Sequence, residues 1–235
     1  VMLMADLGLQ FKNTNPDSTI YYGQKALNLA EQIKFLRGEA HAINTIALAM
    51  REKGDLPKAL ELSMKAYKIG LANNYVYETS ASVRRIGHVY MDLKEYRTSL
   101  KYLQRALQLN ESIQHKRGMA IEYVTIGMTY EYMAILDSAL YFIQKAENSK
   151  EYFEDLYPEV NRVFGNIYAK KGNPKLALFY YRKGIDAGSA LNDFRTMSFI
   201  YADAARMFRQ LNQIDSSILY AKNGLKYGQL ASYKK

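Results

Sequence analysis

Apolar residues recur along this chain at helical spacing, in pairs of stripes separated by a short polar turn. In residues 40–70 the first stripe consists of Ile43, Ile46, Ala47 and Met50. Gly54 ends this predicted helix and Asp55 caps the next one, with Pro57 in its first turn. The second stripe consists of Ala59, Leu60, Leu62, Ala66 and Tyr67. The pattern predicts a helical hairpin.

The same hairpin pattern returns along the whole chain. One small residue near the end of each second stripe marks it best, and its copies are Ala26, Ala66, Ala106, Ala146, Gly184 and Gly224. These copies are 40 residues apart, except for one step of 38. A fixed period of this length is typical of stacked repeat proteins, so the sequence predicts an all-α solenoid of about six helical hairpins.

Each predicted hairpin has small residues where its two helices approach each other. In the first helices these are Ala47, Gly87, Gly127, Gly165 and Ala205. In the second helices, twelve residues later, they are Ala59, Ser99, Ala139, Ala177 and Ser217. Large side chains alternate with them, at Met50, Tyr90, Tyr130, Tyr168 and Phe208. This alternation predicts an interdigitated core; in the first unit the packing positions hold Asp6 and Leu7.

The turns of the hairpins carry further signals. Asn15-Pro16 and Asn173-Pro174 predict the starts of two second helices, because a capping side chain is followed by proline in the first turn. The turn glycine seen at Gly54 is missing at the equivalent positions Lys94, Ala134 and Asn212.

These residues resemble the tetratricopeptide repeat: a small residue, an aromatic one three positions later, a turn of the Gly-Asp type, then Ala-Leu and Lys-Ala-Leu. The resemblance covers the whole chain and implies a single domain over residues 1–235, a right-handed superhelical solenoid. Its units are expected at about 1–33, 40–73, 80–113, 120–150, 158–190 and 198–231. The usual unit has about 34 residues, so each hairpin here carries about six more.

Composition and motifs exclude several classes of function. The chain has no cysteine, hence no disulfide, thiolate metal site or cysteine nucleophile. It lacks the glycine-rich phosphate loops, the His-Glu-x-x-His motif and the Gly-x-Ser-x-Gly elbow, and its three histidines (His41, His88 and His115) fall at different places in the repeat. We therefore predict no catalytic residue, no metal site and no cofactor. The net charge of +9 is spread over every repeat, which indicates solvated helix faces rather than a nucleic-acid surface.

The resemblance also implies where a ligand would bind. In tetratricopeptide arrays the first helices line a concave face, and partners usually lie in that groove. When this chain is aligned with the repeat pattern of the family, the polar residues at groove-facing positions are Asn44, Arg51, Arg84, His88, Arg162, Asn166, Arg206 and Arg209. Guanidinium groups and side-chain amides suit carboxylates and peptide backbone, so we expect a protein or peptide, including an acidic segment, in this groove. The alternative is an unoccupied groove whose arginines only keep the array soluble.

A narrower resemblance rests on phrases at the starts of three second helices, at residues 17–22, 137–141 and 215–220, which read Asp-Ser followed by an apolar residue and tyrosine. These phrases are similar to those of the N-terminal sensor regions of bacterial membrane-bound histidine kinases. That implies a periplasmic input module cut from a longer, membrane-anchored and dimeric protein, with no membrane insertion by this chain itself. The alternative is a cytoplasmic adaptor or a peptide-responsive regulator. Either would transmit binding through the curvature of the superhelix.

Overall fold

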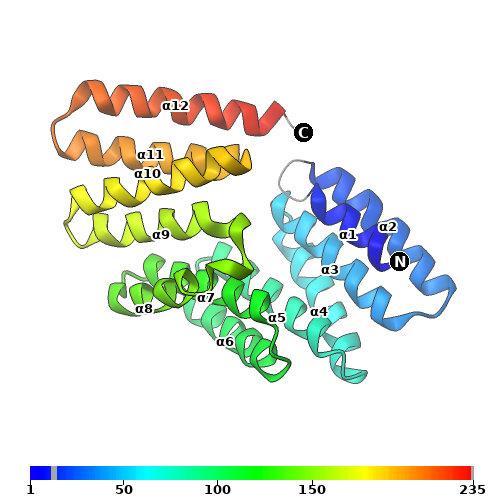
Figure 1. The fold of residues 1–235 in the computed structure, drawn as a ribbon. Coiled ribbons are helices and arrows are strands. Elements are labelled where there is room, and N and C mark those ends of the chain that lie inside the picture. Colours follow the sequence, from blue (N-terminus) through cyan, green and yellow to red (C-terminus); the bar gives the residue numbers. More distant parts are fainter. Residues whose placement is uncertain (12–14, 234–235) are drawn as a thin grey trace. The chain divides into compact units, whose positions relative to one another are not determined.

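The structure, a computed structural model, describes residues 1–11 and 15–233 of the 235-residue chain (Figure 1). The described residues form twelve α-helices and two short 3-10 helices, and none of them lies in a strand. This confirms the predicted all-α class. The chain divides into two compact units, residues 1–122 and 123–235. The end of the predicted domain at Lys235 lies outside the described residues.

Unit 1 contains three complete hairpins. Its helices are α1 (Met2–Gln10), α2 (Pro16–Gln32), α3 (Leu36–Glu52), α4 (Leu56–Ala72), α5 (Val76–Asp92) and α6 (Tyr96–Ser112). Helix α7 (Lys116–Tyr132) begins in unit 1 and ends in unit 2. Each second helix packs on its own first helix and on the first helix of the next hairpin, as α4 does with α3 and α5. The first helices α1, α3 and α5 also contact one another in sequence order, so they form one face of the unit.

Unit 2 continues the same arrangement with one irregular connection. Its further helices are α8 (Leu136–Glu147), α9 (Tyr157–Lys170), α10 (Pro174–Leu191), α11 (Phe194–Gln210) and α12 (Ile214–Tyr233). Two 3-10 helices, Lys150–Tyr152 and Glu154–Leu156, replace the last turn of α8 and lead into α9. This is the place where the sequence period shortens to 38. In Figure 1 the helices α9 to α12 lie side by side within the unit, and α9, α10, α11 and α12 are in contact in that order.

The connections explain why the period is 40 rather than 34. Most helices have 17 residues, and three-residue turns join them both within and between hairpins. Helix α3 therefore begins at Leu36, ahead of the unit start expected at residue 40. The extra residues of each unit lengthen the helices instead of forming longer linkers.

Each three-residue turn places one residue in the left-handed region. Gly54 has φ +82°, while Lys94 and Ala134, where glycine was expected, adopt φ 61° and 57°. After α3, the amides of Gly54 and Asp55 donate to the carbonyls of Arg51 and Met50, the Schellman pattern that ends many helices. The side chain of Asp55 then accepts a hydrogen bond from the amide of Lys58 at 3.0 Å, as predicted for a cap. Asn15 and Asn173 cap α2 and α10 in the same way.

The small residues lie where the helices touch, as predicted. A Cβ atom added at Gly165 would sit 2.3 Å from the ring of Tyr181, so only glycine allows α9 and α10 this approach. Ser99 donates a hydrogen bond to the carbonyl of Gly87 at 2.8 Å, which ties α6 directly to α5. In the first hairpin the prediction was wrong by one residue. Thr19 bonds the carbonyl of Gly8, whereas Leu7 is 45% exposed.

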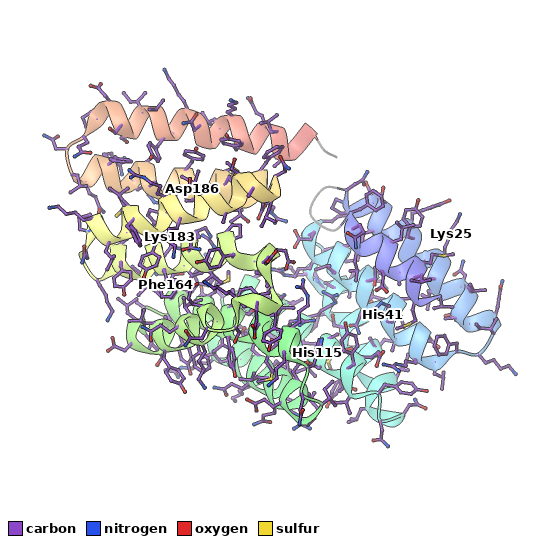
Figure 2. All side chains as sticks on the ribbon, in the orientation of Figure 1. Lys25, His41, His115, Phe164, Lys183 and Asp186 are labelled. Atoms are coloured by element: carbon purple, nitrogen blue, oxygen red, sulfur yellow. The ribbon has the colours of Figure 1, made fainter. Side chains whose placement is uncertain are left out.

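Three of the large side chains predicted between the small ones stack on rings across their hairpins. Tyr90 of α5 stacks on Tyr102 of α6 with ring centroids 5.5 Å apart. Tyr130–Phe142 and Tyr168–Tyr180 are stacked in the same way, whereas the rings of Phe208 and Tyr220 are in contact but tilted by 55°. Phe164, labelled in Figure 2, extends the stack on Tyr180 within unit 2. Aromatic pairs contribute beyond their buried area, so these hairpins are held by a ring contact as well as by close backbone approach.

Candidate functional site

The eight residues predicted to face a ligand all lie on first helices. Asn44 and Arg51 are on α3, Arg84 and His88 on α5, Arg162 and Asn166 on α9, and Arg206 and Arg209 on α11. We call the surface formed by the first helices of each unit its first-helix face. The contacts of these residues decide how much of their polar chemistry is available to a ligand.

In unit 1 the arginines of the first-helix face are joined to carboxylates of the next repeat. The guanidinium of Arg51 donates two hydrogen bonds to the carboxylate of Asp92, at 2.6 and 3.0 Å. Arg84 donates to Glu122 at 3.3 Å, and Arg37 to Glu78 at 2.7 Å. Each pair therefore links neighbouring first helices, α3 to α5 or α5 to α7.

Asn44 is part of the same inter-repeat contact. Its side-chain amide is buried and donates to the carbonyl of Glu78 at 3.2 Å and to the hydroxyl of Ser82 at 2.9 Å. These bonds fix α3 to α5, so Asn44 holds the array together instead of reaching outward.

Two carboxylates of this face are fully buried, Glu78 and Glu122. One oxygen of each has a partner, while Glu78 Oε2 and Glu122 Oε2 receive no hydrogen bond from the residues that the structure describes. Burial raises the pKa of Glu122 from its ordinary value to about 7, although Arg84 and the amide of Asn110 favour the charged form. The Glu122 carboxyl therefore titrates near neutral pH.

Cations crowd the middle of α5. Burial lowers the pKa of His88 well below its ordinary value, and the charges of Arg51, Arg84 and Arg85 act in the same direction. Burial also lowers the pKa of Arg85 to about 9, again with Arg84 and Arg51 adding to the effect. The guanidinium groups of Arg51, Arg84 and Arg85 thus lie close enough together for their charges to act on one another. Arg85 was not among the predicted residues.

The three histidines have separate surroundings in unit 1, and Figure 2 labels two of them, His41 and His115. His41 lies 2.8 Å from a carboxylate oxygen of Asp6, and His115 lies 3.2 Å from the side-chain oxygen of Asn110. His115 also packs edge-on against Tyr77. Across the part of the chain that the structure describes, no group of three His, Asp or Glu side chains has an arrangement suited to a metal ion.

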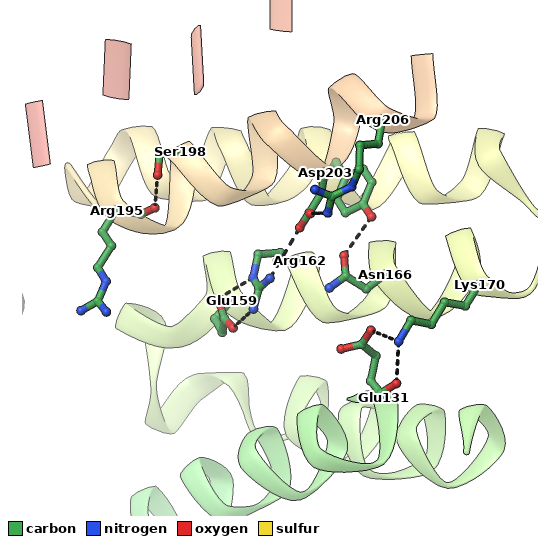
Figure 3. A network of polar contacts seen from close by, with 10 residues as sticks. Glu131, Glu159, Arg162, Asn166, Lys170, Arg195, Ser198, Asp203 and Arg206 are labelled. Carbon is green, nitrogen blue, oxygen red and sulfur yellow. Dashed lines mark hydrogen bonds and ion pairs between the residues drawn. The ribbon is translucent and has the colours of Figure 1, made fainter. Parts of the chain in front are cut away.

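Unit 2 has its own polar network on the first-helix face (Figure 3). Arg162 donates two hydrogen bonds to Glu159, at 2.9 and 2.6 Å, and a longer one of 3.5 Å to Asp203 of α11. Arg206 pairs with the same Asp203 from the other side. One carboxylate is thus shared by two of the predicted arginines.

The rest of that network joins α7, α9 and α10. Asn166 accepts a hydrogen bond from the hydroxyl of Tyr181 at 2.9 Å. Lys170 donates to the backbone carbonyl of Glu131 and pairs with its carboxylate, each at 2.7 Å. The bond to Tyr181 uses only the side-chain oxygen of Asn166, so the side-chain nitrogen can donate to a ligand.

These acidic partners were not predicted from the sequence, although the repeat offers a signal for them. Arg37–Glu78, Arg51–Asp92 and Arg162–Asp203 are each 41 residues apart. A spacing of one period plus one residue brings a side chain to the same level on the next first helix. The binding role of the eight predicted residues stays a prediction, and most of them have a structural partner.

Arg206 and Arg209 are the most accessible of the predicted residues. The side chain of Arg206 is 62% exposed although it pairs with Asp203. Both arginines border a cavity of about 550 Å³ between α11 and α12, whose apolar lining includes Phe199 and Leu225. The guanidinium of Arg162 lies 5.8 Å from the ring centre of Phe199, so a cation also reaches this wall. None of the helices in the described residues is both long and apolar enough to cross a membrane.

A family model described as the tetratricopeptide repeat matches residues 85–113 and 163–187. Two segments of the chain thus match the tetratricopeptide repeat. Among curated relatives, it is 22% identical to tetratricopeptide repeat protein 29 of Trypanosoma brucei brucei (strain 927/4 GUTat10.1) over 125 residues, or 53% of this chain and 26% of that protein. It is 31% identical to response regulator aspartate phosphatase H of Bacillus subtilis (strain 168) over 113 residues, or 48% of this chain and 30% of that protein. The repeats thus span less than half the length of these relatives.

Solved structures share the fold over nearly the whole chain. A Rap protein complexed with competence and sporulation factor has a TM-score of 0.80 at 14% identity, covering 100% of this chain and 65% of the other. NprR in complex with its cognate peptide NprX has a TM-score of 0.70 at 13% identity, covering 92% and 67%. These likenesses confirm the predicted helical solenoid.

Proposed function

We propose that these repeats form a non-catalytic, peptide-binding scaffold of a regulatory protein. The observation that carries the proposal is the likeness over at least nine-tenths of the chain to two solved repeat proteins described with a bound factor or cognate peptide. The first-helix face is the surface on which such a peptide would lie. The relatives called response regulator aspartate phosphatases favour a regulator over a passive adaptor.

The chemistry of the first-helix face supports a peptide as the ligand. A peptide in extended form offers backbone carbonyls and amides at regular intervals, and Asn166 still has a free donor beside its bond to Tyr181. Arg206 and Arg209 offer guanidinium groups at the edge of an apolar cavity, which suits a peptide carrying both apolar and acidic side chains. No step of this proposal requires a catalytic residue.

Binding would act on the array through its inter-repeat contacts. Each repeat of a solenoid touches only the neighbouring repeats, so small rotations between repeats add up along the array. The pairs Arg51–Asp92 and Arg162–Asp203 join neighbouring first helices, so a rotation between repeats would change the geometry of these pairs. A peptide shifts the array only if it binds one curvature better than another. In this proposal the altered curvature changes the affinity for a second protein.

The narrower prediction of a periplasmic sensor region of a histidine kinase stays a prediction. The relatives and solved structures named above favour the alternative reading, a peptide-responsive regulator scaffold, for which we propose a cytoplasmic location.

The proposal is tested by selecting linear peptides from a random ten-residue library on the immobilised protein. We expect enrichment of peptides that share a motif and that lose affinity on the variant Arg209→Glu. Arg182→Glu, an exposed arginine of the second helix α10, is the matched control and should bind normally. Absence of any enriched peptide, or equal loss with both variants, would count against a first-helix binding face.

A further inference from the structure

Three second helices of unit 2 carry a large apolar side chain at the same outward position. Tyr141 of α8, Phe179 of α10 and Leu219 of α12 follow one another at the repeat spacing, and each is more than half exposed. In unit 1 two of the three second helices have a charged residue there, Glu61 and Lys101. An extended apolar patch bordered by polar residues is typical of an interaction site. We call Tyr141, Phe179 and Leu219 the outer apolar row.

The two aromatic rings of this row are held in place by the core beneath them. Tyr141 packs edge-on against Phe142 with ring centroids 5.2 Å apart, and Phe179 packs in the same way against Tyr180 at 5.3 Å. Phe142 and Tyr180 are themselves stacked on rings of first helices. Because these rings are already fixed, covering them with a partner costs little conformational entropy.

A row of cations runs beside the outer apolar row. Its members stand three or four residues after the apolar positions and are Lys145, Arg182, Lys183 and Lys222. The ammonium of Lys145 lies 4.8 Å from the ring centre of Tyr141, and that of Lys183 lies 5.9 Å from the ring centre of Phe179. An ammonium group is attracted to the face of a ring, so these cations are positioned next to the apolar side chains.

The charge balance of the three helices is positive. Together α8, α10 and α12 carry six lysines and arginines against four acids, and none of those acids stands in the cation row. Lys183, labelled in Figure 2, lies 4.0 Å from Glu147 of α8, so α8 and α10 are neighbours on this face. The apolar row and the cation row therefore form parts of one surface.

Such a surface matches one side of an acidic amphipathic helix. A helix of this kind has an apolar stripe with carboxylates beside it, so the stripe would cover the outer apolar row while the acids meet the cations. A second copy of this chain fits less well, because pairing the face with itself would bring its cations together. The rings, fixed on the core and only half exposed, are also poorly placed to reach into a lipid bilayer.

We propose that this face of unit 2 binds an acidic amphipathic helix of a partner protein. Tyr141 and Phe179 are its apolar anchors, and Lys145 and Lys183 meet the acids of the helix. The inference goes beyond the proposed function and does not depend on it, because the linear peptide is placed on first helices. It gives the repeats a second binding surface, formed by the second helices of unit 2.

The test selects helices from a displayed library with leucine at every third or fourth position and random residues elsewhere. We expect the helices that bind the wild-type protein to be rich in Asp and Glu beside the leucines. Phe179→Ser should weaken their binding about 10- to 30-fold, because an aromatic anchor is removed. Lys183→Glu should weaken it as well, because a charge that meets the helix is reversed.

Tyr21→Ser is the matched control for Phe179→Ser. Tyr21 holds the same repeat position on α2 of unit 1 and is equally exposed, at 54%, so this variant should bind the selected helices normally. Circular dichroism and thermal unfolding check the fold of each variant. Should Phe179→Ser lower the unfolding temperature, Lys183→Glu carries the test alone.

Retention of no helix, retained helices without an excess of acids, or unchanged binding by the unit 2 variants would each overturn the proposal. The linear peptides of the proposed function provide a separate readout. They should bind Phe179→Ser normally, and the selected helices should bind Arg209→Glu normally. Failure of one surface therefore leaves the other intact.

Two measurements address other occupants of this face. A dimer of the wild-type chain that Phe179→Ser dissociates in analytical ultracentrifugation would place a second copy there. Binding to vesicles of phosphatidylglycerol and phosphatidylcholine that the same variant abolishes would place a lipid surface there. Either result would overturn the proposed partner helix, and we expect neither.

Discussion

Arg51 of α3 and Asp92 of α5 are joined by two hydrogen bonds, of 2.6 and 3.0 Å, across a repeat boundary. Their side chains are only 19% and 32% exposed, and the forked geometry holds both in place. Arg162 and Asp203 repeat the relationship in unit 2 with the same sequence separation. Residues that look from the sequence like ligand-binding arginines therefore also act as ties between neighbouring repeats.

The Arg51–Asp92 tie should show a measurable coupling energy. We expect a double-mutant cycle of Arg51→Ala and Asp92→Ala to give about 1 kcal/mol of interaction, because the pair is bidentate. The measurement is urea unfolding followed by circular dichroism. The exposed pair Lys58–Glu61 within α4 is the control and should couple by less than about 0.5 kcal/mol. Equal coupling in the two cycles would contradict a special role for the inter-repeat pair.

Glu122 should make stability depend on pH. Because its pKa is raised in the folded chain from the ordinary 4.5 to about 7, the protonated form favours folding. That stabilisation is fully present below about pH 4.5 and is lost as the pH rises through about 7. The full effect is on the order of 3 kcal/mol.

The variant Glu122→Gln isolates this effect. It keeps an oxygen for Arg84 and Asn110 but removes the titration, so its unfolding free energy should vary less between pH 5 and pH 8 and exceed that of wild type at pH 8. Thermal unfolding at several pH values measures the difference. Parallel pH profiles for the two proteins would refute the assignment.

The left-handed turn residues offer stabilising substitutions. Lys94 and Ala134 adopt φ 61° and 57°, a conformation that costs side-chain-bearing residues about 1 kcal/mol and glycine almost nothing. Lys94→Gly and Ala134→Gly should each raise the unfolding temperature, and Gly54→Ala should lower it. Asn212→Gly should gain less, because asparagine tolerates this region. No gain at either site would contradict the strain argument.

Gly165 is expected to tolerate no side chain. The added Cβ would lie 2.3 Å from the ring of Tyr181, so Gly165→Ala should cost about 1–3 kcal/mol and displace the hydroxyl that bonds Asn166. Gly228→Ala is the matched control, since its Cβ would meet only Ser198 at 3.9 Å. That variant should be neutral or slightly stabilising. Chemical unfolding of both variants provides the comparison.

The repeat made most of the fold predictable from the sequence. A period of 40 positions every small residue, so the contacts of Gly87, Gly165 and Ser99 followed from spacing alone. The prediction that Leu7 packs between the helices of the first hairpin was wrong by one residue. The contact there joins Gly8 and Thr19, which are 11 residues apart, whereas Gly87 and Ser99 are 12 apart. Spacing measured on later repeats did not apply there.

The candidate face was harder to predict than the fold. The repeat spacing correctly predicted that Arg51, Arg84 and Arg162 lie on first helices. It did not predict which carboxylate each arginine would bind. The partner acids are Asp92, Glu122 and Asp203, which follow their arginines by 41, 38 and 41 residues. Each pair therefore forms only when adjacent repeats pack together. Arg85 was not predicted, because the contacts of its Nε atom, which has no acceptor among the described residues, depend on how the neighbouring repeats pack.

The central claim is that a linear peptide binds on the first helices. Hydrogen–deuterium exchange with and without a selected peptide tests it most directly, because bound peptide slows local opening of the helices it touches. We predict that protection is concentrated in α3, α5, α9 and α11, with α4, α6 and α10 little changed. Protection confined to the second helices, or no protection at saturating peptide, would contradict the account.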